Sequence, residues 1–353
     1  MRPSCVSLFS GCGGLDWGLR EAGFNISYAT DLEPLCGDSH KSNFGEETRF
    51  EVASVESISK ESIQATIESE LHGLELLVGG PPCPPYSKSR FYRKEKPRGL
   101  ADPVGDATLA GYLRLLEELK PRAFLFENVP GFSFKVHRTA VEALVSKAHS
   151  LGYSTAWEVI NAADYGVPQI RKRFFMVGML DRKFKFPKQT HRDPSSKQSE
   201  LFSESLPPWV TAGEVINDLD TPENACDAGH FAGGKHHDLL REVPPGDNYL
   251  FFTKERGHPE PKFQWRSRYW SFLLKLSPDM PSWTIQARRS NNMGPLHWRN
   301  RILRIEEVKR LQTFPDHFQL AGTLEQQWRQ VGNAVPPLMA EVLGKAILSQ
   351  LEG

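Results

Sequence analysis

The first half of the chain alternates short apolar segments with helical ones, and this alternation constrains the fold more than any other feature. Apolar segments of strand length occupy residues 5–9, 27–30, 74–78, 123–126, 155–160 and 173–178. Helical patterns between them occupy residues 15–22, 109–119 and 141–151. The alternation predicts an α/β fold, with a mostly parallel sheet and helices on both of its faces.

Three unusual segments directly follow predicted strands. SGCGG follows residues 5–9, GGPPCPPYS follows residues 74–78, and ENVPG follows residues 123–126. Ligands of parallel α/β sheets bind beyond the carboxyl ends of the strands. We therefore expect the functional site where these three segments meet.

The second half of the chain differs in composition. Residues 183–208 are polar and rich in Pro and Ser, which predicts a boundary or linker. The net charge is zero, yet residues 254–310 hold 13 Lys and Arg against 5 Asp and Glu, with seven interleaved aromatics. Residues 31–75 are acidic, with 11 acids against 3 bases. The basic aromatic segment fits a nucleic-acid surface, and a solvated surface over an aromatic core is the alternative.

The cysteines and the hydropathy pattern exclude several classes of protein. The five cysteines include no C-x-x-C pair, so a disulfide framework and a zinc site are not expected, and we predict no metal. No apolar run is long enough for a membrane span, and the first residues do not resemble a signal peptide. We expect a cytoplasmic protein with no membrane partner.

The glycine turn is a candidate nucleotide site. Glycines 11, 13 and 14 permit a sharp turn and close approach of a ligand to the backbone. Asp31 ends the next predicted strand, where an acid can bind ribose hydroxyls. The spacing is not G-x-G-x-x-G, so a dinucleotide is disfavoured and an adenosine-type cofactor is expected. A plain strand–helix turn is the alternative.

Cys83 is the candidate nucleophile. Four prolines surround it in the GGPPCPPYS loop and restrict the backbone, which would hold the thiol at a fixed angle. An inert buried cysteine is the commoner situation, but packing alone does not need so rigid a loop. Positive charge close by would favour the thiolate or bind phosphate, and six basic residues follow: Lys88, Arg90, Arg93, Lys94, Lys96 and Arg98.

Further polar residues lie at neighbouring strand ends. Glu127 and Asn128 end one predicted strand, and a carboxylate with a raised pKa there could protonate a ring nitrogen. Arg171 and Arg173 are two residues apart, so both could reach the same site. A structural ion pair for Glu127 and plain surface charge for the arginines are the alternatives.

Six motifs together resemble one known family. FSGCGG, GGPPC, ENV, QIRKR, RLQTFP and GNAVPP, in this order, look like the motifs of DNA cytosine-5 methyltransferases, over nearly the whole chain. The resemblance implies a Rossmann-like methyltransferase fold that binds S-adenosylmethionine, with a smaller target-recognition domain. It places the catalytic domain at residues 1–185, target recognition at 186–320, and a segment that returns to the catalytic domain at 321–353.

The resemblance also implies residue roles. Cys83 would attack C6 of a flipped-out cytosine, Glu127 would bind and protonate N3, Arg173 would bind the base and orient Glu127, and Arg171 would support the loop. Cofactor contacts would come from Phe9, Ser10, Gly11, Cys12, Gly13, Gly14, Asp31, Leu32, Pro82, Asn333 and Val335. DNA contacts would come from Pro82, Ser87, Asn128 and Gln169.

The sequence departs from the family pattern at three positions. Pro84 replaces the usual glutamine after the nucleophile, which bears on how the gap left by the flipped base is filled. Ser54 stands where an acid often lies near the adenine amino group. Leu32 stands where an aromatic residue is common, so stacking on adenine should be weaker.

The preferred function is therefore sequence-specific methylation of double-stranded DNA by a bacterial monomer that serves beside a restriction or defence nuclease. A tRNA methyltransferase of the same family is the nearest alternative, but the long interval between QIRKR and RLQTFP favours DNA. A non-catalytic DNA-binding relative would not need Cys83, Glu127 and Arg173 together. A nicotinamide dehydrogenase would need the glycine fingerprint that this chain lacks.

Overall fold

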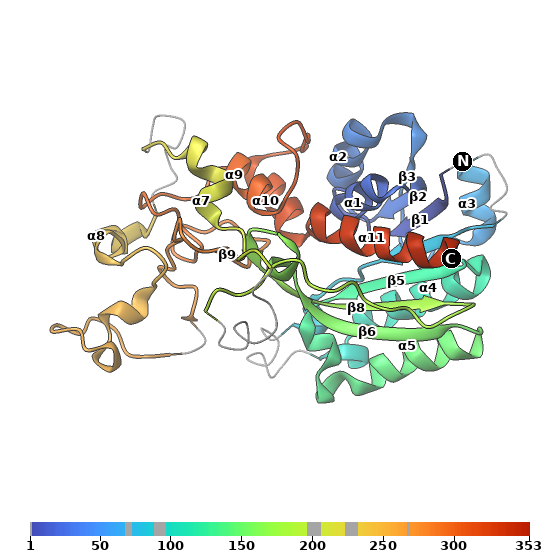
Figure 1. Ribbon diagram of the computed structural model, residues 1–353, viewed down its shortest axis with the longest axis horizontal. Coiled ribbons are helices and arrows are strands. Elements are labelled where there is room, and N and C mark those ends of the chain that lie inside the picture. The colour runs from blue at the N-terminus through green and yellow to red at the C-terminus, as the bar shows by residue number, and fades with distance from the viewer. Residues whose placement is uncertain (1, 68–72, 88–96, 196–205, 223–231, 267–268) are drawn as a thin grey trace.

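A computed structural model of the chain describes residues 2–67, 73–87, 97–195, 206–222, 232–266 and 269–353. Its central element is a seven-stranded sheet with strand order β3-β2-β1-β4-β5-β8-β6 (Figure 1). The strands are β1 (Ser4–Leu8), β2 (Asn25–Asp31), β3 (Arg49–Val52), β4 (Leu76–Gly79), β5 (Ala123–Asn128), β6 (Ser154–Asn161) and β8 (Lys172–Met179). The pairs from β3 to β5 are parallel, and β8 runs antiparallel to both β5 and β6. The predicted α/β fold with a mostly parallel sheet is confirmed.

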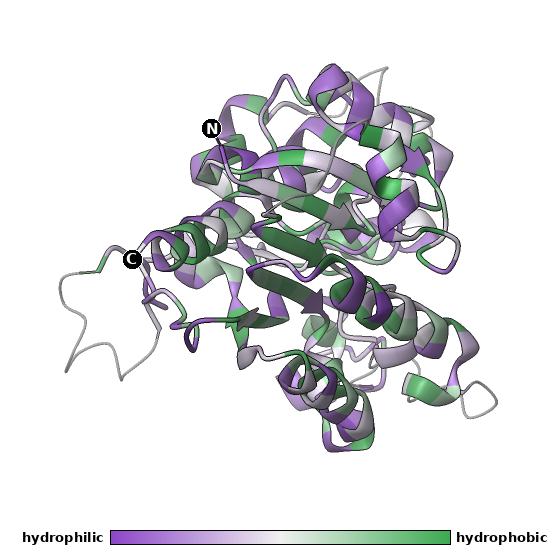
Figure 2. Ribbon diagram, turned by 90° about the vertical axis from the view of Figure 1, so that its right-hand side faces the viewer, coloured by the Kyte–Doolittle hydropathy of each residue, from purple (hydrophilic) through white to green (hydrophobic). Residues whose placement is uncertain are grey.

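Helices cover both faces of the sheet. They are α1 (Gly14–Ala22), α2 (Pro34–Phe44), α3 (Lys60–Ile67), α4 (Pro103–Leu119), α5 (Arg138–Ser150) and α11 (Pro337–Glu352). Successive side chains of a strand point to opposite faces, so the buried strand residues divide between two clusters. Leu125 packs in the cluster that contains residues of α1 and α11, whereas Phe124 and Phe126 pack in the cluster of α4 and α5. Figure 2 shows the hydrophobic colour concentrated in the central strands and mixed on the surrounding helices.

The last helix returns to the first. A Cβ atom at Gly18 of α1 would lie 2.1 Å from the Pro337 carbonyl oxygen, and one at Gly344 of α11 would lie 2.6 Å from Ala22 Cβ. Only glycine permits so close an approach of the two helices. The residues around 332–337 are thereby held beside the glycine turn.

The remaining chain forms a second lobe with few regular elements (Figure 1). Its helices are α7 (Ala212–Ile216), α8 (His237–Glu242) and α9 (Ile305–Leu311), and α10 (Leu324–Asn333) leads back to α11. A short parallel pair joins the lobe to the sheet region, because β7 (Gln169–Ile170) pairs with β9 (Ser282–Trp283). Among the helices that the structure describes, none has the length and apolar character to cross a membrane.

Candidate active site

The glycine turn after β1 has the strained backbone that its sequence predicts. Phe9 has φ 57°, Gly11 has φ 57° and Gly13 has φ 95°, all in the left-handed region. Such values favour glycine, and a bulky residue such as Phe9 at positive φ marks a constrained position. No atom lies within 4 Å of the place a Gly11 Cβ would occupy, so the turn is open on this side.

Asp31 lies directly beside this turn. Its Oδ2 accepts a hydrogen bond from the Gly11 backbone at 2.9 Å, and its Oδ1 accepts one from the Glu33 backbone at 3.0 Å. Burial raises the pKa of the Asp31 carboxyl, and the two backbone donors act in the opposite direction. Leu32, the next residue, is 67% exposed at the rim. An acid and an exposed apolar side chain thus border the open turn.

The returning segment completes this corner. A Cβ at Gly14 would lie 2.6 Å from the Val335 carbonyl oxygen, so Val335 contacts a residue 321 positions earlier in the chain. Val335 is buried and Asn333 is exposed. Cys12 has its sulfur in the hydrophobic core, where burial raises its pKa to about 12, so only its backbone can face a ligand. The open turn, the acid and this segment fit a nucleoside-type cofactor.

Cys83 lies in the loop beyond β4. A short 3₁₀ turn at Pro84–Tyr86 follows it, the Tyr86 amide donates to the Cys83 carbonyl at 3.0 Å, and the Cys83 side chain is partly exposed. Pro82 is likewise partly exposed, and Pro84 is exposed. Asn128 Nδ2 donates to the Pro81 carbonyl at 3.2 Å. Asn128 is fully buried and holds the loop. The predicted contact of Asn128 with DNA is therefore wrong.

The Cys83 thiol is not activated in the described structure. Burial raises its pKa to about 11, and Glu127 raises it further, whereas Arg173, Arg171 and a hydrogen bond from the Val129 backbone lower it. The prediction that the basic residues of segment 88–98 lower this pKa concerns side chains almost wholly outside the described residues, since Arg98 is the one of those six bases that the structure describes. The free thiol is therefore mostly protonated at neutral pH.

Glu127 and Arg173 form the predicted pair. Arg173 Nε lies 3.1 Å from Glu127 Oε1, and both side chains are largely buried. Burial raises the pKa of Glu127, and Arg173 and Arg171 oppose this shift. Gly80 provides space for the carboxylate, because a Cβ there would lie 2.8 Å from Glu127 Oε2. Sequence reasoning did not single out Gly80, although it lies inside the GGPPC motif.

Arg171 does not present its guanidinium to the site. Its side chain is 1% exposed, and the guanidinium donates to the carbonyls of Ile285 at 3.1 Å and Gly332 at 2.9 Å. It donates also to the Ala334 carbonyl at 2.8 Å. Arg171 therefore fastens the returning segment and the second lobe to the sheet, which agrees with the predicted support of the loop but not with a direct catalytic contact.

Gln169 is a second correction. It is fully buried, and its Nε2 donates to Gln312 Oε1 at 2.8 Å and to the Leu311 carbonyl at 3.2 Å. Its Oε1 accepts from the Ile285 amide at 3.0 Å. Since the whole amide group is engaged inside the protein, Gln169 is not placed to contact DNA. Ser87, by contrast, is partly exposed.

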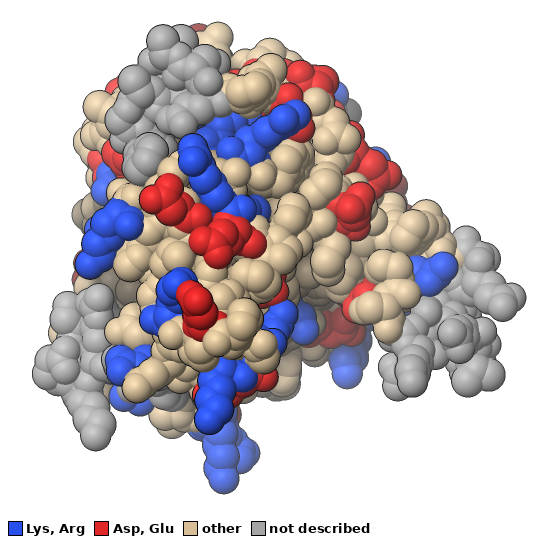
Figure 3. Space-filling model, turned by 90° about the vertical axis from the view of Figure 1, so that its left-hand side faces the viewer, with Lys and Arg blue, Asp and Glu red and all other residues tan. Residues whose placement is uncertain are grey.

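Much of the basic segment at residues 254–310 is structural. Arg301 is 1% exposed and binds both carboxylate oxygens of Glu307, at 2.9 and 2.5 Å. Arg299 pairs with Asp220 at 2.8 Å. Figure 3 accordingly shows basic and acidic side chains interspersed on this side of the molecule. The aromatics divide as well: Phe263 and Phe272 pack against the core, whereas Trp265, Tyr269 and Trp270 are 41–54% exposed.

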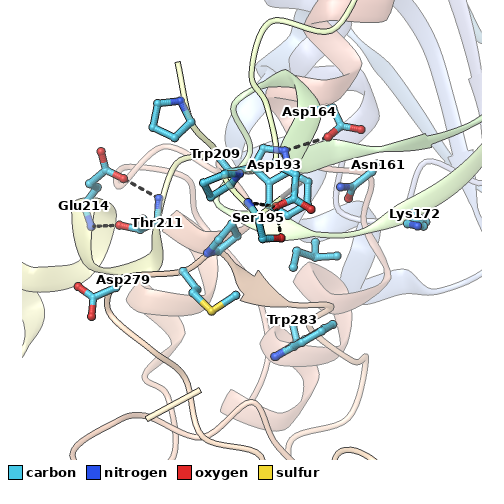
Figure 4. Close-up of a pocket in the computed structure, with 15 residues that line it drawn as sticks. Asn161, Asp164, Lys172, Asp193, Ser195, Trp209, Thr211, Glu214, Asp279 and Trp283 are labelled. Atoms are coloured by element: carbon cyan, nitrogen blue, oxygen red, sulfur yellow. Dashed lines mark hydrogen bonds between the residues drawn. The ribbon is translucent and has the colours of Figure 1, made fainter. Parts of the chain in front are cut away.

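A cavity of about 790 Å³ lies where the second lobe meets β6 and β8, and it contains none of the predicted site residues (Figure 4). Among the residues that the structure describes, its lining includes the indoles of Trp209 and Trp283 and one lysine, Lys172. Four carboxylates also line it: Asp164, Asp193, Glu214 and Asp279. This lining suits neither a phosphate backbone nor the chemistry expected of Cys83.

Comparison with known proteins agrees with this geometry. The family model for C-5 cytosine-specific DNA methylase matches residues 4–349. Type II methyltransferase M.SacI of Streptomyces achromogenes is 37% identical over 98% of this chain and 93% of its own. Type II methyltransferase M.MthTI of Methanothermobacter thermautotrophicus is 34% identical over 100% of this chain and 99% of its own. The solved structure of Entamoeba histolytica methyltransferase EhMeth is 19% identical, with 100% of each chain covered, and has a TM-score of 0.65, a likeness that bears on the fold alone.

Proposed function

The chain belongs to the C-5 cytosine-specific DNA methylase family and is a DNA cytosine-5 methyltransferase, and from this premise we propose that Cys83 is its covalent nucleophile. The observation that supports this assignment most strongly is the grouping of a partly exposed Cys83 with the Glu127–Arg173 pair at the ends of β4 and β5. The cytosine is flipped out of the duplex, because C5 and C6 are inaccessible to a nucleophile inside a base stack.

Two residues of this chain react with the cytosine, and a third, Arg173, positions one of them. The Cys83 thiol releases its proton to solvent and its sulfur bonds to C6, while Glu127, with its raised pKa, donates a proton to N3. Arg173 holds the resulting carboxylate in place through its 3.1 Å contact. After C5 has accepted a methyl group, a proton acceptor removes the C5 proton, the electron pair of that C–H bond re-forms the C5–C6 double bond, and the C6–S bond breaks so that Cys83 leaves as a thiolate. The N3 proton returns to the Glu127 carboxylate.

S-adenosylmethionine, when bound, supplies the methyl group that C5 accepts. We propose that the backbone of residues 9–14 lines its pocket, that Asp31 binds its ribose hydroxyls, and that Leu32, Pro82, Asn333 and Val335 complete the pocket. The open space at Gly11 and the contact of Gly14 with Val335 support this assignment.

The second lobe would read the DNA. We propose that residues 1–185 and 321–353 form the catalytic domain and that residues 186–320 recognise a specific cytosine-containing site in double-stranded DNA. This proposal is supported by the β7–β9 pair and the Arg171 contacts, which join the lobe to the sheet region. The names of its Type II relatives support protection of host DNA beside a restriction or defence nuclease. We further propose that the enzyme acts as a monomer.

Covalent trapping tests the proposal. The full chain is incubated with S-adenosylmethionine and DNA in which 5-fluorocytosine replaces cytosine, since fluorine cannot leave as the C5 proton does and the adduct persists. We expect a denaturation-resistant adduct whose modified peptide contains Cys83, and none with Cys83→Ser. That variant should still bind DNA, because the sulfur contributes chemistry more than affinity.

Two outcomes would overturn the assignment. An adduct that survives in Cys83→Ser would place the nucleophile elsewhere, and loss of DNA binding in that variant would make the loop structural.

A parallel reaction with tRNA as methyl acceptor tests the nearest alternative, a tRNA methyltransferase of the same family. Bisulfite sequencing of DNA from cells that express the protein would then identify the methylated site.

A further inference from the structure

A buried chain of hydrogen bonds runs beneath the glycine turn, and the proposed chemistry does not use it. The Ser10 hydroxyl donates to Ser7 Oγ at 2.9 Å, and the Ser7 hydroxyl donates to Asp16 Oδ1 at 2.5 Å. On the other side of the carboxylate, His40 Nε2 lies 2.9 Å from Asp16 Oδ2. Ser7, Asp16 and His40 are 0% exposed and Ser10 is 8% exposed. We call these four residues the relay.

The carboxylate sets the direction of the relay. A buried carboxylate only accepts hydrogen bonds and is costly to leave unpaired, so Ser7 and His40 must both donate to Asp16. The Ser7 oxygen is then free to accept from Ser10. Because its one hydrogen is directed inward, the Ser10 hydroxyl can only accept a hydrogen bond from anything bound at the turn.

His40 is also packed directly against the turn. Its ring stacks on Phe44 at a centroid distance of 4.0 Å. A Cβ at Gly13 would lie 2.6 Å from the Phe44 ring and 3.0 Å from His40 Cδ2. The Nδ1 atom is buried and has no hydrogen-bond partner among the described residues, so the tautomer with its hydrogen on Nε2 satisfies the ring best. Any shift of His40 would therefore move the turn.

The helix that carries His40 reaches the returning segment as well. On α2, Ser39 Oγ donates to Gln330 Oε1 at 2.6 Å and accepts from the Ala321 amide at 2.8 Å. Asn43, one turn further along α2, exchanges two hydrogen bonds with the Gln319 backbone, at 2.8 and 2.9 Å. Helix α2 thus connects the glycine turn to the segment that leads to Asn333 and Val335.

We propose that Asp16 and His40 are positioning residues for the cofactor: through the relay and α2 they fix both halves of the pocket, and they set its affinity for S-adenosylmethionine without touching it. The inference rests on the proposed function, because it takes the glycine turn and residues 333–335 as the cofactor pocket. If Asp16 and His40 only stabilised the fold, replacing either residue would instead lower the stability of the protein and its DNA affinity together.

The first test compares two replacements of His40 in the full chain. Leucine in His40→Leu keeps the bulk and removes the donor, whereas His40→Gln places a carboxamide NH₂ where it can donate to Asp16. Calorimetric titration with S-adenosylmethionine should show a dissociation constant raised at least tenfold in His40→Leu, about 1.4 kcal/mol. His40→Gln should restore most of the affinity. DNA affinity, and kcat at saturating cofactor, should stay within about twofold in both variants.

A second pair of variants decides the question if His40→Leu does not fold. Ser7→Ala removes one hydroxyl from the middle of the relay and should weaken cofactor binding several-fold. Ser27→Ala is the matched control, since its hydroxyl donates to the Cys5 carbonyl at 3.2 Å, outside the relay. It should leave cofactor affinity unchanged.

The results separate failure of this inference from failure of the proposed function. Unchanged cofactor affinity in both His40→Leu and Ser7→Ala would refute the inference. The proposed pocket would still stand in that case, because the wild-type protein would bind S-adenosylmethionine. Equal losses of cofactor and DNA affinity would also refute it, since they would reveal a general packing defect. If the wild-type protein bound no S-adenosylmethionine, the pocket assignment itself would be wrong.

Discussion

At the scale of single residues, the chemistry depends on charges that are partly withdrawn from water. Burial raises the pKa of both Cys83 and Glu127, the Glu127 carboxylate adds to the shift at Cys83, and Arg173 acts against both shifts. A protonated Glu127 is what a donor to N3 requires, whereas a protonated Cys83 is not what a nucleophile requires. Burial thus favours the protonated form of both groups, so Cys83 must lose its proton before its sulfur attacks C6, and Glu127 must hold a proton when it donates to N3.

This arrangement predicts how Cys83 reacts with iodoacetamide. Only the thiolate reacts, so the alkylation rate should rise about tenfold per pH unit from pH 7 until it levels near pH 11, where the thiol pKa lies. Glu127→Gln removes a negative charge that disfavours the thiolate and should therefore lower the pKa and speed alkylation at pH 8. Mass spectrometry of the Cys83 peptide measures both rates, and Cys83→Ser gives the background. A rate already constant from pH 7 would contradict the raised pKa.

Gly80 gives a second prediction at this scale. Its backbone has an ordinary φ, but the methyl of Gly80→Ala would lie 2.8 Å from Glu127 Oε2 and must displace the carboxylate. Misplacement of a catalytic group by about 1 Å can cost roughly 100-fold in rate. We expect a loss of that order in kcat with little change in thermal stability. The kcat and the melting temperature of Gly80→Ala are compared with those of the wild type and of Glu127→Gln. Gly73→Ala would not serve as a matched control, because Gly73 has a positive φ that alanine rarely adopts.

The sequence predicted which side chains lie together at the strand ends better than it predicted the partners of their neighbours. The grouping of Cys83, Glu127 and Arg173 could be expected because each lies directly beyond or at the end of a predicted strand, and such ends meet at one edge of the sheet. Arg171 and Gln169 were misjudged because their partners are carbonyls and an amide more than 110 positions away. No local pattern shows which carbonyls the folded chain brings opposite an arginine.

At the scale of elements, the strands that carry the site were predictable and the helix that supports it was not. β1, β4, β5 and β8 are apolar runs bounded by turns, which is a strong local signal. Helix α2 has the sequence PLCGDSHKSNF, in which apolar residues are too sparse to form a stripe. Its buried residues are Cys36, Gly37, Ser39, His40 and Phe44, and the hydrogen bonds of Ser39 and His40 stand where a helix usually has apolar contacts.

The junction between β7, β9 and the returning segment yields a prediction of stability. Arg171→Met would leave the buried carbonyls of Ile285, Gly332 and Ala334 without their donor. Unpaired buried groups cost about 1–3 kcal/mol each, partly relieved by relaxation, so the free energy of unfolding should fall by roughly 2–4 kcal/mol. Urea denaturation measures it. Lys172→Met, at the neighbouring exposed position, should change it by less than about 0.5 kcal/mol.

At the scale of the whole molecule, zero net charge conceals an uneven distribution, but fewer cations are free for DNA than the composition suggests. Arg299 and Arg301 are committed to carboxylates, whereas Arg288 is exposed and no partner of it is described. Basic side chains of the second lobe can therefore stabilise the lobe through ion pairs or bind DNA phosphates, and the net charge is the same in both cases. Only the folded structure distinguishes the two uses.

This distinction can be measured through salt. Each phosphate neutralised contributes about −0.9 to the slope of log affinity against log salt concentration. We expect a steep negative slope for the wild type, a slope shallower by about one in Arg288→Ala, and an unchanged slope in Arg299→Ala. Fluorescence anisotropy with a labelled duplex from 50 to 200 mM salt measures it. An affinity that hardly varies with salt would refute an electrostatic DNA surface.

The packing of α11 on α1 has a consequence for how the protein is made. The first helix leaves the ribosome more than 300 residues before its partner, which at roughly 5–20 residues per second is a delay of about 15 to 60 seconds. Throughout that interval the nascent chain carries an uncovered apolar face beside an unfinished glycine turn. Contacts of such long sequence separation form slowly in refolding too, so the pocket must be among the last parts of the molecule to assemble.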